Sequence, residues 1–471
     1  MPYSQPPVLL ALSSLSASLA NDAYGATGAT AGAIELLVGL LALALVTALL
    51  ARRLRFPYTL ALTIVGLGLG FSHFLPSLRF APDVVLFIFL PALLFEGAWN
   101  LSVKHLVANW VAIALLAGPG LIIALFIAAV PLHFAAGLPW LIALLVAAIV
   151  SPTDPIAVVG LLRQMGMSTR LRVIIEGESL FNDGAGVTAY TIILSILLAA
   201  QSGALAGGAT LGWTTTLILQ SLWLIIGGPI IGLVVAFIIT RLLRRIVDRL
   251  IEVTITVSVA YGVYLLADAL HTSGLLAVIC AGLALGYYGR RYGISQQAAD
   301  AVDTVWDFLA FVANSLLFLV LGAEIGSASI LGVLVPIIWA VIGVIVGRAL
   351  IVYALLPAHD AFAHWLEQRR PHSRVRGRPI AIPRGWRPLI TLAGLRGALS
   401  LALALNLSTS LPDVTLIQQM TYGVVLVTLL GQGVGMRVIL PRWPGVREPS
   451  ALAKEAKQAA GAAPATTSEK S

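Results

Sequence analysis

The sequence reads SPTDP at residues 151–155 and GESLFNDG at residues 177–184, and each stretch interrupts a long apolar run. Both runs are long enough to be membrane-spanning helices. A charged side chain at the centre of such a helix costs about 2.5–3.5 kcal/mol on insertion scales. Asp154, Glu178 and Asp183 together would therefore carry a large cost. We expect these carboxylates to form a polar site for an ion or a proton.

The first stretch also breaks its own helix. Pro152 and Pro155 have no N–H to donate, so carbonyls one turn earlier lose their hydrogen-bond partners. Within lipid these carbonyls must be satisfied by protein, water or a bound cation. A broken helix with free carbonyls beside a carboxylate such as Asp154 is typical of the cation sites of transporters. The plainer alternative is a proline kink beside a hydrogen-bonded aspartate.

The composition is that of a polytopic membrane protein. The 471 residues are 59% hydrophobic and 11% charged, with a mean hydropathy of +0.96. No soluble globular domain needs that much apolar surface. The net charge of +8 does not indicate nucleic-acid binding, because the arginines stand in the connections between apolar runs. The single cysteine, Cys280, excludes an intramolecular disulfide and a cysteine metal site.

Apolar windows of membrane-spanning length predict about thirteen spans. They cover residues 33–51, 58–75, 83–98, 106–130, 139–162, 172–200, 213–240, 249–270, 273–289, 304–322, 330–356, 387–406 and 413–437. Lys and Arg follow the odd-numbered spans, whereas the alternate connections are nearly free of both. The positive-inside rule then places the N-terminus outside and the C-terminus in the cytoplasm. The Ala-, Leu- and Arg-rich composition with short connections favours a bacterial inner membrane.

The segments outside the spans complete the predicted organisation. Residues 1–32 form an N-terminal segment outside the membrane, in which the apolar residues 8–20 fit either a signal-like or an interfacial segment. Residues 33–437 form the membrane transporter domain. A basic cytoplasmic loop is predicted at residues 357–386, and a short disordered cytoplasmic tail at residues 438–471.

A second break is predicted in the twelfth span, where Gly394 and Gly397 flank Arg396 in an otherwise apolar run. Glycine is a poor helix former, and an arginine inside the membrane needs a reason. If spans one to six and eight to thirteen are two repeats, the fifth and twelfth spans correspond. Discontinuous helices in such positions indicate an inverted-repeat transporter. The predicted fold is an all-α polytopic membrane protein with two inverted repeats and crossing broken helices.

The charges inside the predicted spans should pair. Glu178 in the sixth span and Arg348 in the eleventh are expected to form an ion pair, because a buried charge without a partner is very costly. Ser179 and Asp183 are four residues apart and share one helix face, and Glu178 and Asn182 share the neighbouring face. One face should line the ion site, and the other should hold the helix to its neighbour.

Three further charged residues have simple electrostatic or solvation explanations. Arg396 is expected to supply positive charge at the crossing, where it balances helix ends and carboxylates. Glu176 lies near a predicted span end, where interfacial solvation explains it. Asp307 opens the tenth span, where a helix N-terminus favours negative charge.

These motifs resemble those of the NhaP/NHE-type sodium–proton exchangers of the first monovalent cation:proton antiporter family. The resemblance rests on Ser151–Pro155, on Gly177–Gly184 with its Asn-Asp pair, and on Gly394–Ala398, and it covers about residues 33–437. It implies an NhaA-like antiporter fold with a core domain, dimerisation helices and a homodimer. The expected partners are therefore monovalent cations, protons, membrane lipid and a second copy of the chain, and not nucleic acid.

The resemblance also implies which residues bind the cation. The implied Na+ ligands are the main-chain carbonyl of Thr153 and the side chains of Asp154, Ser179 and Asp183. The implied supporting residues are Glu96, which acts through water in some members, Asn182, Arg396 and the ion pair of Glu178 with Arg348.

The predicted function is secondary transport, with no enzyme activity and no cofactor beyond the transported Na+ and H+. Asp183 would bind either a proton or a Na+ (or Li+) ion, and alternating access would turn that competition into antiport. Electrogenic relatives carry two adjacent aspartates at this place, so Asn182 implies electroneutral exchange of one proton for one cation.

Three alternatives remain at this point, one near and two remote. K+/H+ antiport on the same site is the nearer one, because oxygen ligands alone do not select Na+. An intramembrane aspartyl protease using Asp154 and Asp183 is remote, since it leaves the paired helix breaks unexplained. An ion-sensing receptor that has lost transport is the other remote alternative.

Overall fold

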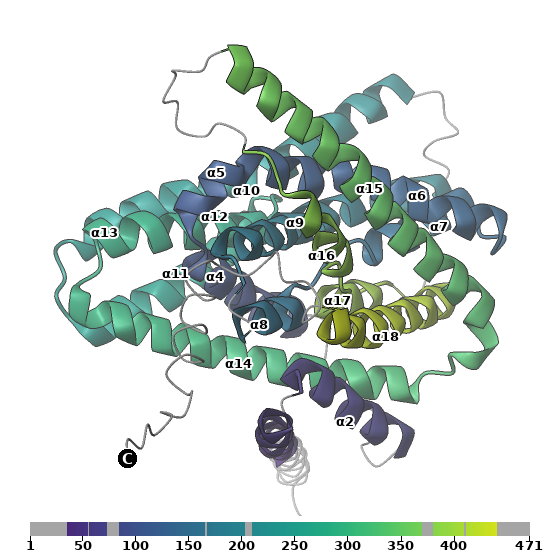
Figure 1. Cartoon of the computed structure of the whole chain (residues 1–471), viewed down its shortest axis with the longest axis horizontal. Coiled ribbons are helices and arrows are strands. Elements are labelled where there is room, and N and C mark those ends of the chain that lie inside the picture. The colour runs from purple at the N-terminus through teal and green to yellow at the C-terminus, as the bar shows by residue number, and fades with distance from the viewer. Residues whose placement is uncertain are drawn as a thin grey trace, which may run out of the picture.

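The computed structural model describes residues 35–54, 56–72, 84–164, 167–202, 210–369, 380–408 and 411–439. Over these ranges the chain forms helices joined by short connections, and no β-sheet is present (Figure 1). The predicted N-terminal segment, with residues 8–20, lies outside the described residues, and so does nearly all of the predicted tail.

The helices follow the predicted spans in order, and several extend further at their ends. The helices before the first break are Glu35–Arg53, α2 (Tyr58–Ser72), α4 (Leu90–Asn100), α5 (Val103–Leu115), α6 (Leu121–Phe134) and α7 (Trp140–Ile149). Those that follow it are α8 (Ile156–Gln164), α9 (Thr169–Gln201), α10 (Thr210–Leu243), α11 (Arg249–Ala269), α12 (Gly274–Ala284), α13 (Arg290–Tyr292), α14 (Gln296–Ser327) and α15 (Leu334–Arg369). The last are α16 (Arg387–Leu392), α17 (Ala398–Leu405) and α18 (Val414–Ile439).

Short π-helical turns join α5 to α6 and α12 to α13 and precede α4, so that these helices continue without a break. Single π-helical turns lie at Val85–Phe89, Leu116–Gly120 and Leu285–Gly289. Among the described residues, eight helices are long and apolar enough to cross a membrane, and three shorter apolar helices accompany them. The all-α polytopic fold class is therefore confirmed, while the number of about thirteen spans and the two repeats stay predictions.

The described part of the predicted basic loop differs from the expectation. α15 runs on to Arg369, so residues 357–369 of the predicted loop 357–386 are helical. Asp360 in this helical stretch accepts a hydrogen bond on Oδ2 from Arg387 Nη2 at 2.7 Å. This ion pair holds the end of α15 against the start of α16. Residues 370–379 lie outside the described part of the chain.

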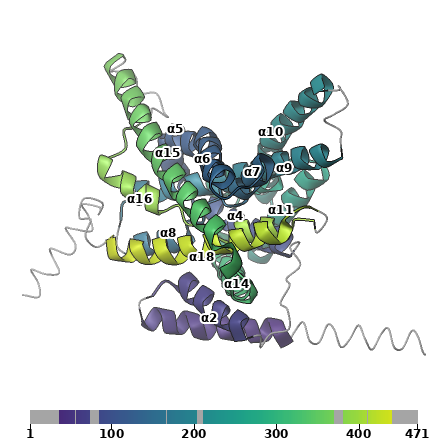
Figure 2. The ribbon, with the colours of Figure 1, turned by 90° about the vertical axis from the view of Figure 1, so that its right-hand side faces the viewer.

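Helices α2 and α14 approach each other unusually closely. Gly66 and Gly70 of α2 face Gly322 and Gly326 of α14, and a methyl group at Gly66 would lie 2.0 Å from the carbonyl oxygen of Leu319. Small residues four apart allow two backbones to touch, which is how many membrane helices associate. In both views α2 lies against α14 at the edge of the molecule (Figure 2). The pair forms one wall of the space described below.

Aromatic side chains fix α4 against α14. Phe95 and Trp306 lie with ring centroids 4.3 Å apart, and both are fully buried. Trp99 Nε1 donates a hydrogen bond to Asp303 Oδ1 at 2.7 Å. These contacts hold Glu96, on the same helix, beside the start of α14.

Candidate functional site

The two predicted helix breaks meet in space. α7 ends at Ile149 and α8 begins at Ile156, and the backbone N–H of Asp154 between them donates to the carbonyl oxygen of Leu395 at 2.8 Å. Leu395 lies in the second break, between α16 and α17. Gly397 of that break is required by the contact, because a methyl group there would lie 2.3 Å from Asp154 Oδ2. The crossing of the two extended segments is thus a direct backbone contact.

Helix α9 is tied to the first break by side-chain hydrogen bonds. The Ser179 hydroxyl donates to the carbonyl oxygen of Thr153, and Thr153 Oγ1 lies 3.2 Å from Ser179 Oγ. Asn182 Nδ2 donates to Thr153 Oγ1 at 3.1 Å and reaches Ser151 O at 3.5 Å. All four side chains are buried. These bonds satisfy polar groups that the broken helix would leave without partners.

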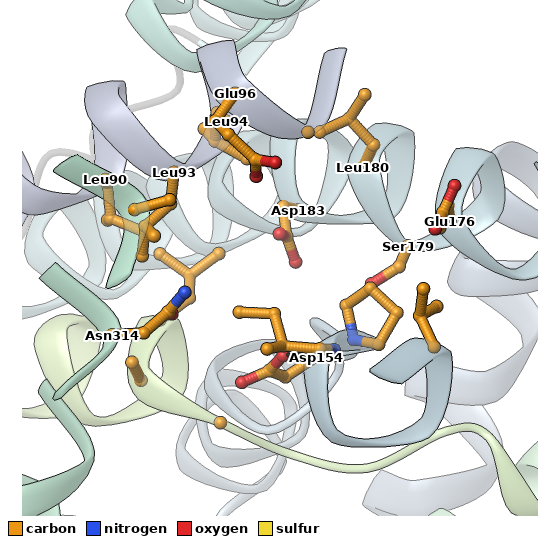
Figure 3. A pocket seen from close by; sticks show the side chains of 18 of the residues that line it. Leu90, Leu93, Leu94, Glu96, Asp154, Glu176, Ser179, Leu180, Asp183 and Asn314 are labelled. Atoms are coloured by element: carbon orange, nitrogen blue, oxygen red, sulfur yellow. Dashed lines mark hydrogen bonds between the residues drawn. The ribbon is translucent and has the colours of Figure 1, made fainter. Parts of the chain in front are cut away.

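A cavity of about 410 Å³ lies beside this crossing. Its lining includes the predicted cation ligands Thr153, Asp154, Ser179 and Asp183, together with Glu96. Figure 3 shows Asp183 and Asp154 extending into the space from opposite sides, with Ser179 next to them. The two aspartates are partly exposed to the cavity, unlike the buried ion pair described next. The structure therefore brings the predicted ligands together around one space.

The predicted ion pair is formed on the neighbouring face of α9. Arg348 Nη1 and Nη2 donate to Glu178 Oε1 and Oε2 at 2.6 and 2.7 Å, a bidentate pair. Arg348 Nη2 also donates to the carbonyl oxygen of Ile390 at 3.1 Å. Both side chains are buried, and neither lines the cavity. These contacts connect α9, α15 and α16, which indicates a structural role for the pair.

Arg396 is buried behind the crossing and does not line the cavity. Its Nη1 donates to the carbonyl oxygen of Gly394 at 3.3 Å, and its Nε has no hydrogen-bond partner. It lies within electrostatic reach of Glu178 and Asp183. The residue thus places a positive charge near the carboxylates of Glu178 and Asp183.

The chemistry of the lining fits an alkali cation better than a transition metal. The residues around Asp183 offer carboxylate, hydroxyl and carbonyl oxygens, the donors that hard cations prefer. Within the described ranges, no group of three or more His, Cys, Asp and Glu side chains is arranged to hold a metal ion.

Comparison with known families identifies the chain. The family model described as "Sodium/hydrogen exchanger, transmembrane" matches residues 40–442. This chain belongs to the sodium/hydrogen exchanger family. Membership makes it a multi-pass membrane ion transporter and not an enzyme, as the motifs predicted.

Similar members of the sodium/hydrogen exchanger family are known in bacteria. The chain is 34% identical to the low-affinity Na+/H+ antiporter NhaS1 of a Synechocystis strain, over 82% of this chain and 69% of that protein. It is 34% identical to the Na+/H+ antiporter NhaP of Pseudomonas aeruginosa, over 76% and 81% of the two chains. It is 30% identical to the Na+/H+ antiporter NhaH of Halobacillus dabanensis, over 86% and 96%.

A solved structure shares the fold of this family member. The sodium proton antiporter MjNhaP1 of Methanocaldococcus jannaschii matches with a TM-score of 0.66 at 20% identity, over 86% of this chain and 95% of that one. At this identity the match concerns the fold alone.

The cavity of this family member also contains polar residues that the sequence did not place there. They are Tyr58, Asn100, Glu176, Asp307 and Asn314. Glu176 and Asp307 were expected at span ends, but α9 begins at Thr169 and α14 at Gln296, so both lie inside helices. A search for apolar windows leaves out the polar first turns of a helix. The predicted spans 172–200 and 304–322 therefore begin after the first residues of α9 and α14. The spacing of Asp307 and Asn314, seven residues apart on one helix face, was the available signal.

Proposed function

We propose that this protein exchanges Na+ (or Li+) for H+ across the membrane, one for one, by alternating access, with Asp183 as the shared site. Three relatives with at least 30% identity carry the name Na+/H+ antiporter, which supports these ions. The proposal includes a homodimer in the inner membrane, with a core domain that moves against dimerisation helices. It also includes an N-terminus outside the cell and a C-terminus in the cytoplasm.

The convergence of four oxygen-bearing residues on one cavity carries the proposal. Thr153 and Asp154 come from the first break, whereas Ser179 and Asp183 come from α9. A hydroxyl can turn its proton away from a carbonyl, so Ser179 Oγ and Thr153 O could both face one cation. The carboxylates of Asp154 and Asp183 beside them would supply the negative charge that attracts the cation. Glu96 also lines the cavity, where it could contribute through water.

Competition for Asp183 is sufficient for antiport. A protonated carboxyl group is neutral and is a poor ligand, so protonation releases the cation. Deprotonation restores the negative charge and the binding of one cation. The site must be able to move between the two faces of the membrane when it holds either a cation or a proton, but not when it is empty and deprotonated. Each cation that moves one way is then matched by a proton that moves the other way.

The contacts of Asn182 support one-for-one exchange. Its amide donates to Thr153 Oγ1 and reaches Glu178 Oε1 at 3.4 Å, and it does not line the cavity. A carboxylate at this position could not donate these bonds. Asn182 therefore acts as a positioning group. Of the two neighbouring residues, only Asp183 can gain or lose a proton. One proton per cation moves no net charge.

The cavity lies on the predicted cytoplasmic side. Five polar residues of its lining lie near the predicted span ends that adjoin Lys- or Arg-containing connections, namely Tyr58, Glu96, Asn100, Glu176 and Asp307. We infer that the conformation described here opens to the cytoplasm. Acidic side chains at such a mouth raise the local concentration of cations.

The test is proton flux in proteoliposomes that carry an imposed pH gradient and contain no Na+. Na+, Li+ and K+ are added in turn, with the membrane potential clamped, to wild type and to Asp183→Asn. We expect Na+ or Li+ to collapse the gradient in the wild type only, with no dependence on the potential.

The other outcomes are equally clear. If K+ alone acts, the ion changes and the site is retained. A current that scales with Na+ would exclude one-for-one exchange. If no cation moves protons, or if Asp183→Asn exchanges as fast as the wild type, the assignment of Asp183 fails.

A further inference from the structure

Asn314 is a buried amide on the cavity wall opposite α9. It lies in the middle of α14, is 6% exposed, and lines the same cavity as Asp154 and Asp183. Figure 3 shows its side chain extending toward the centre of the cavity, on the side opposite Ser179. Asn314 belongs to none of the sequence motifs described above.

The protein satisfies only part of this amide. Its carbonyl oxygen has no hydrogen-bond donor, while Tyr58, also on the lining, is a hydrogen-bond partner of its side chain. A buried polar atom without a partner is rare in native proteins and requires an explanation such as water or an ion. Ala313, Leu316 and Leu317 beside it on α14 are apolar and buried, and the one polar neighbour among these residues, Ser315, does not line the cavity. The polar side chain is therefore not a general feature of this stretch of the helix.

An amide suits a site that alternates between a cation and a proton. A half-turn about its last side-chain bond exchanges its oxygen and nitrogen, so it can present either to the cavity. The oxygen is an acceptor of the kind that hard cations bind. The nitrogen can instead donate to a carboxylate when no cation is present.

The position of Asn314 is fixed by the close packing of α2 and α14. The interlocked glycines Gly66, Gly70, Gly322 and Gly326 leave little room for these helices to slide against each other. Tyr58 of α2 and Asn314 of α14 therefore form a preorganised wall. The predicted cation ligands come from the first break and α9, on the other side of the cavity.

We propose that Asn314 is a further cation-binding residue, whose side-chain oxygen completes the coordination of the ion from the α14 wall. The proposal rests on the Na+/H+ exchange proposed above and deepens it. It adds a neutral oxygen ligand from an element that carries none of the predicted ligands.

The experiment measures the half-saturating Na+ concentration of proton flux in proteoliposomes for wild type, Asn314→Ala and Ser315→Ala. Ser315 is the matched control, because it is the next residue on α14, is buried, and does not line the cavity. We expect Asn314→Ala to raise the half-saturating concentration about three- to tenfold, the effect of losing one neutral polar interaction. The maximal rate at saturating Na+ should stay near that of the wild type, and Ser315→Ala should match the wild type in both.

A second readout is independent of transport. Na+ should raise the melting temperature of the purified wild type, because ligand binding stabilises the folded state, and this increase should be smaller for Asn314→Ala. If Asn314→Ala does not reach the membrane, the same two measurements are made on Asn314→Ser. An unchanged half-saturating concentration and an unchanged Na+-dependent stabilisation in a folded variant overturn the proposal for Asn314. Failure of the wild type to exchange Na+ for H+ overturns the proposed function instead.

Discussion

Single residues in this family member separate into those that link the helices and those that face the cavity. Glu178 and Arg348 are buried and paired in a bidentate contact. Asp154 and Asp183 are partly exposed to the cavity. Ser179 and Glu178 are neighbours in sequence, yet a turn of 100° per residue sends one to the cavity and the other to the ion pair.

The ion pair should matter for stability more than for exchange itself. Glu178→Leu leaves Arg348 charged and buried without a partner, which costs about 3–5 kcal/mol. We expect a lower melting temperature in detergent, measured by thermal unfolding of the purified protein. Adding Arg348→Met should recover part of the loss, because two apolar side chains carry no unpaired charge. A single variant as stable as the wild type would contradict the structural role of the pair.

Two pairs of elements set the geometry of the cavity. The broken segments between α7 and α8 and between α16 and α17 touch through Asp154 and Leu395, and Gly397 permits that approach. The second pair, α2 and α14, forms the facing wall. The predicted cation ligands and the facing wall therefore belong to different elements.

The close approach of α2 and α14 can be tested with two glycines on one helix. A methyl group at Gly66 would lie 2.0 Å from a carbonyl oxygen of α14, whereas one at Gly68 would meet nothing within 4 Å. Gly66→Ala should destabilise the protein by about 1–3 kcal/mol, the usual cost of overpacking. Gly68→Ala should be neutral or slightly stabilising, because alanine is the better helix former. Equal melting temperatures for the two variants would show that the helices are not in contact there.

For the whole molecule, the proposed competition fixes the direction of the pH dependence. Protons and Na+ exclude each other from Asp183, so lowering the pH should weaken Na+ binding. Below the pKa of the carboxyl group, the half-saturating Na+ concentration should rise about tenfold for each pH unit lost, because one proton must leave for each cation bound. Proton flux measured over a series of pH values checks this slope. A rise of about a hundredfold per unit would mean that two protons compete, and one-for-one exchange would then be wrong.

Much of this architecture could be predicted because its signals are local. Apolar runs marked the helices in order, and prolines and glycines marked the two breaks, because these residues cannot continue a hydrogen-bonded helix in lipid. The partnership of Glu178 with Arg348, 170 residues apart, followed from the cost of an unpaired buried charge. Those arguments depend only on which residue types lie inside an apolar run.

The sequence by itself determined the all-α membrane fold, the two breaks and the set of charges that had to be buried together. The tertiary structure decided which polar groups share the cavity with Asp183. Asp307 and Asn314 meet the crossing because α4 and α2 pack against α14, whereas Glu176 reaches the cavity from α9. The tertiary structure also pairs Asp360 of α15 with Arg387, on the far side of the connection that follows α15. Contacts of this kind depend on where distant segments lie in space, which no local pattern of hydrophobicity or charge encodes.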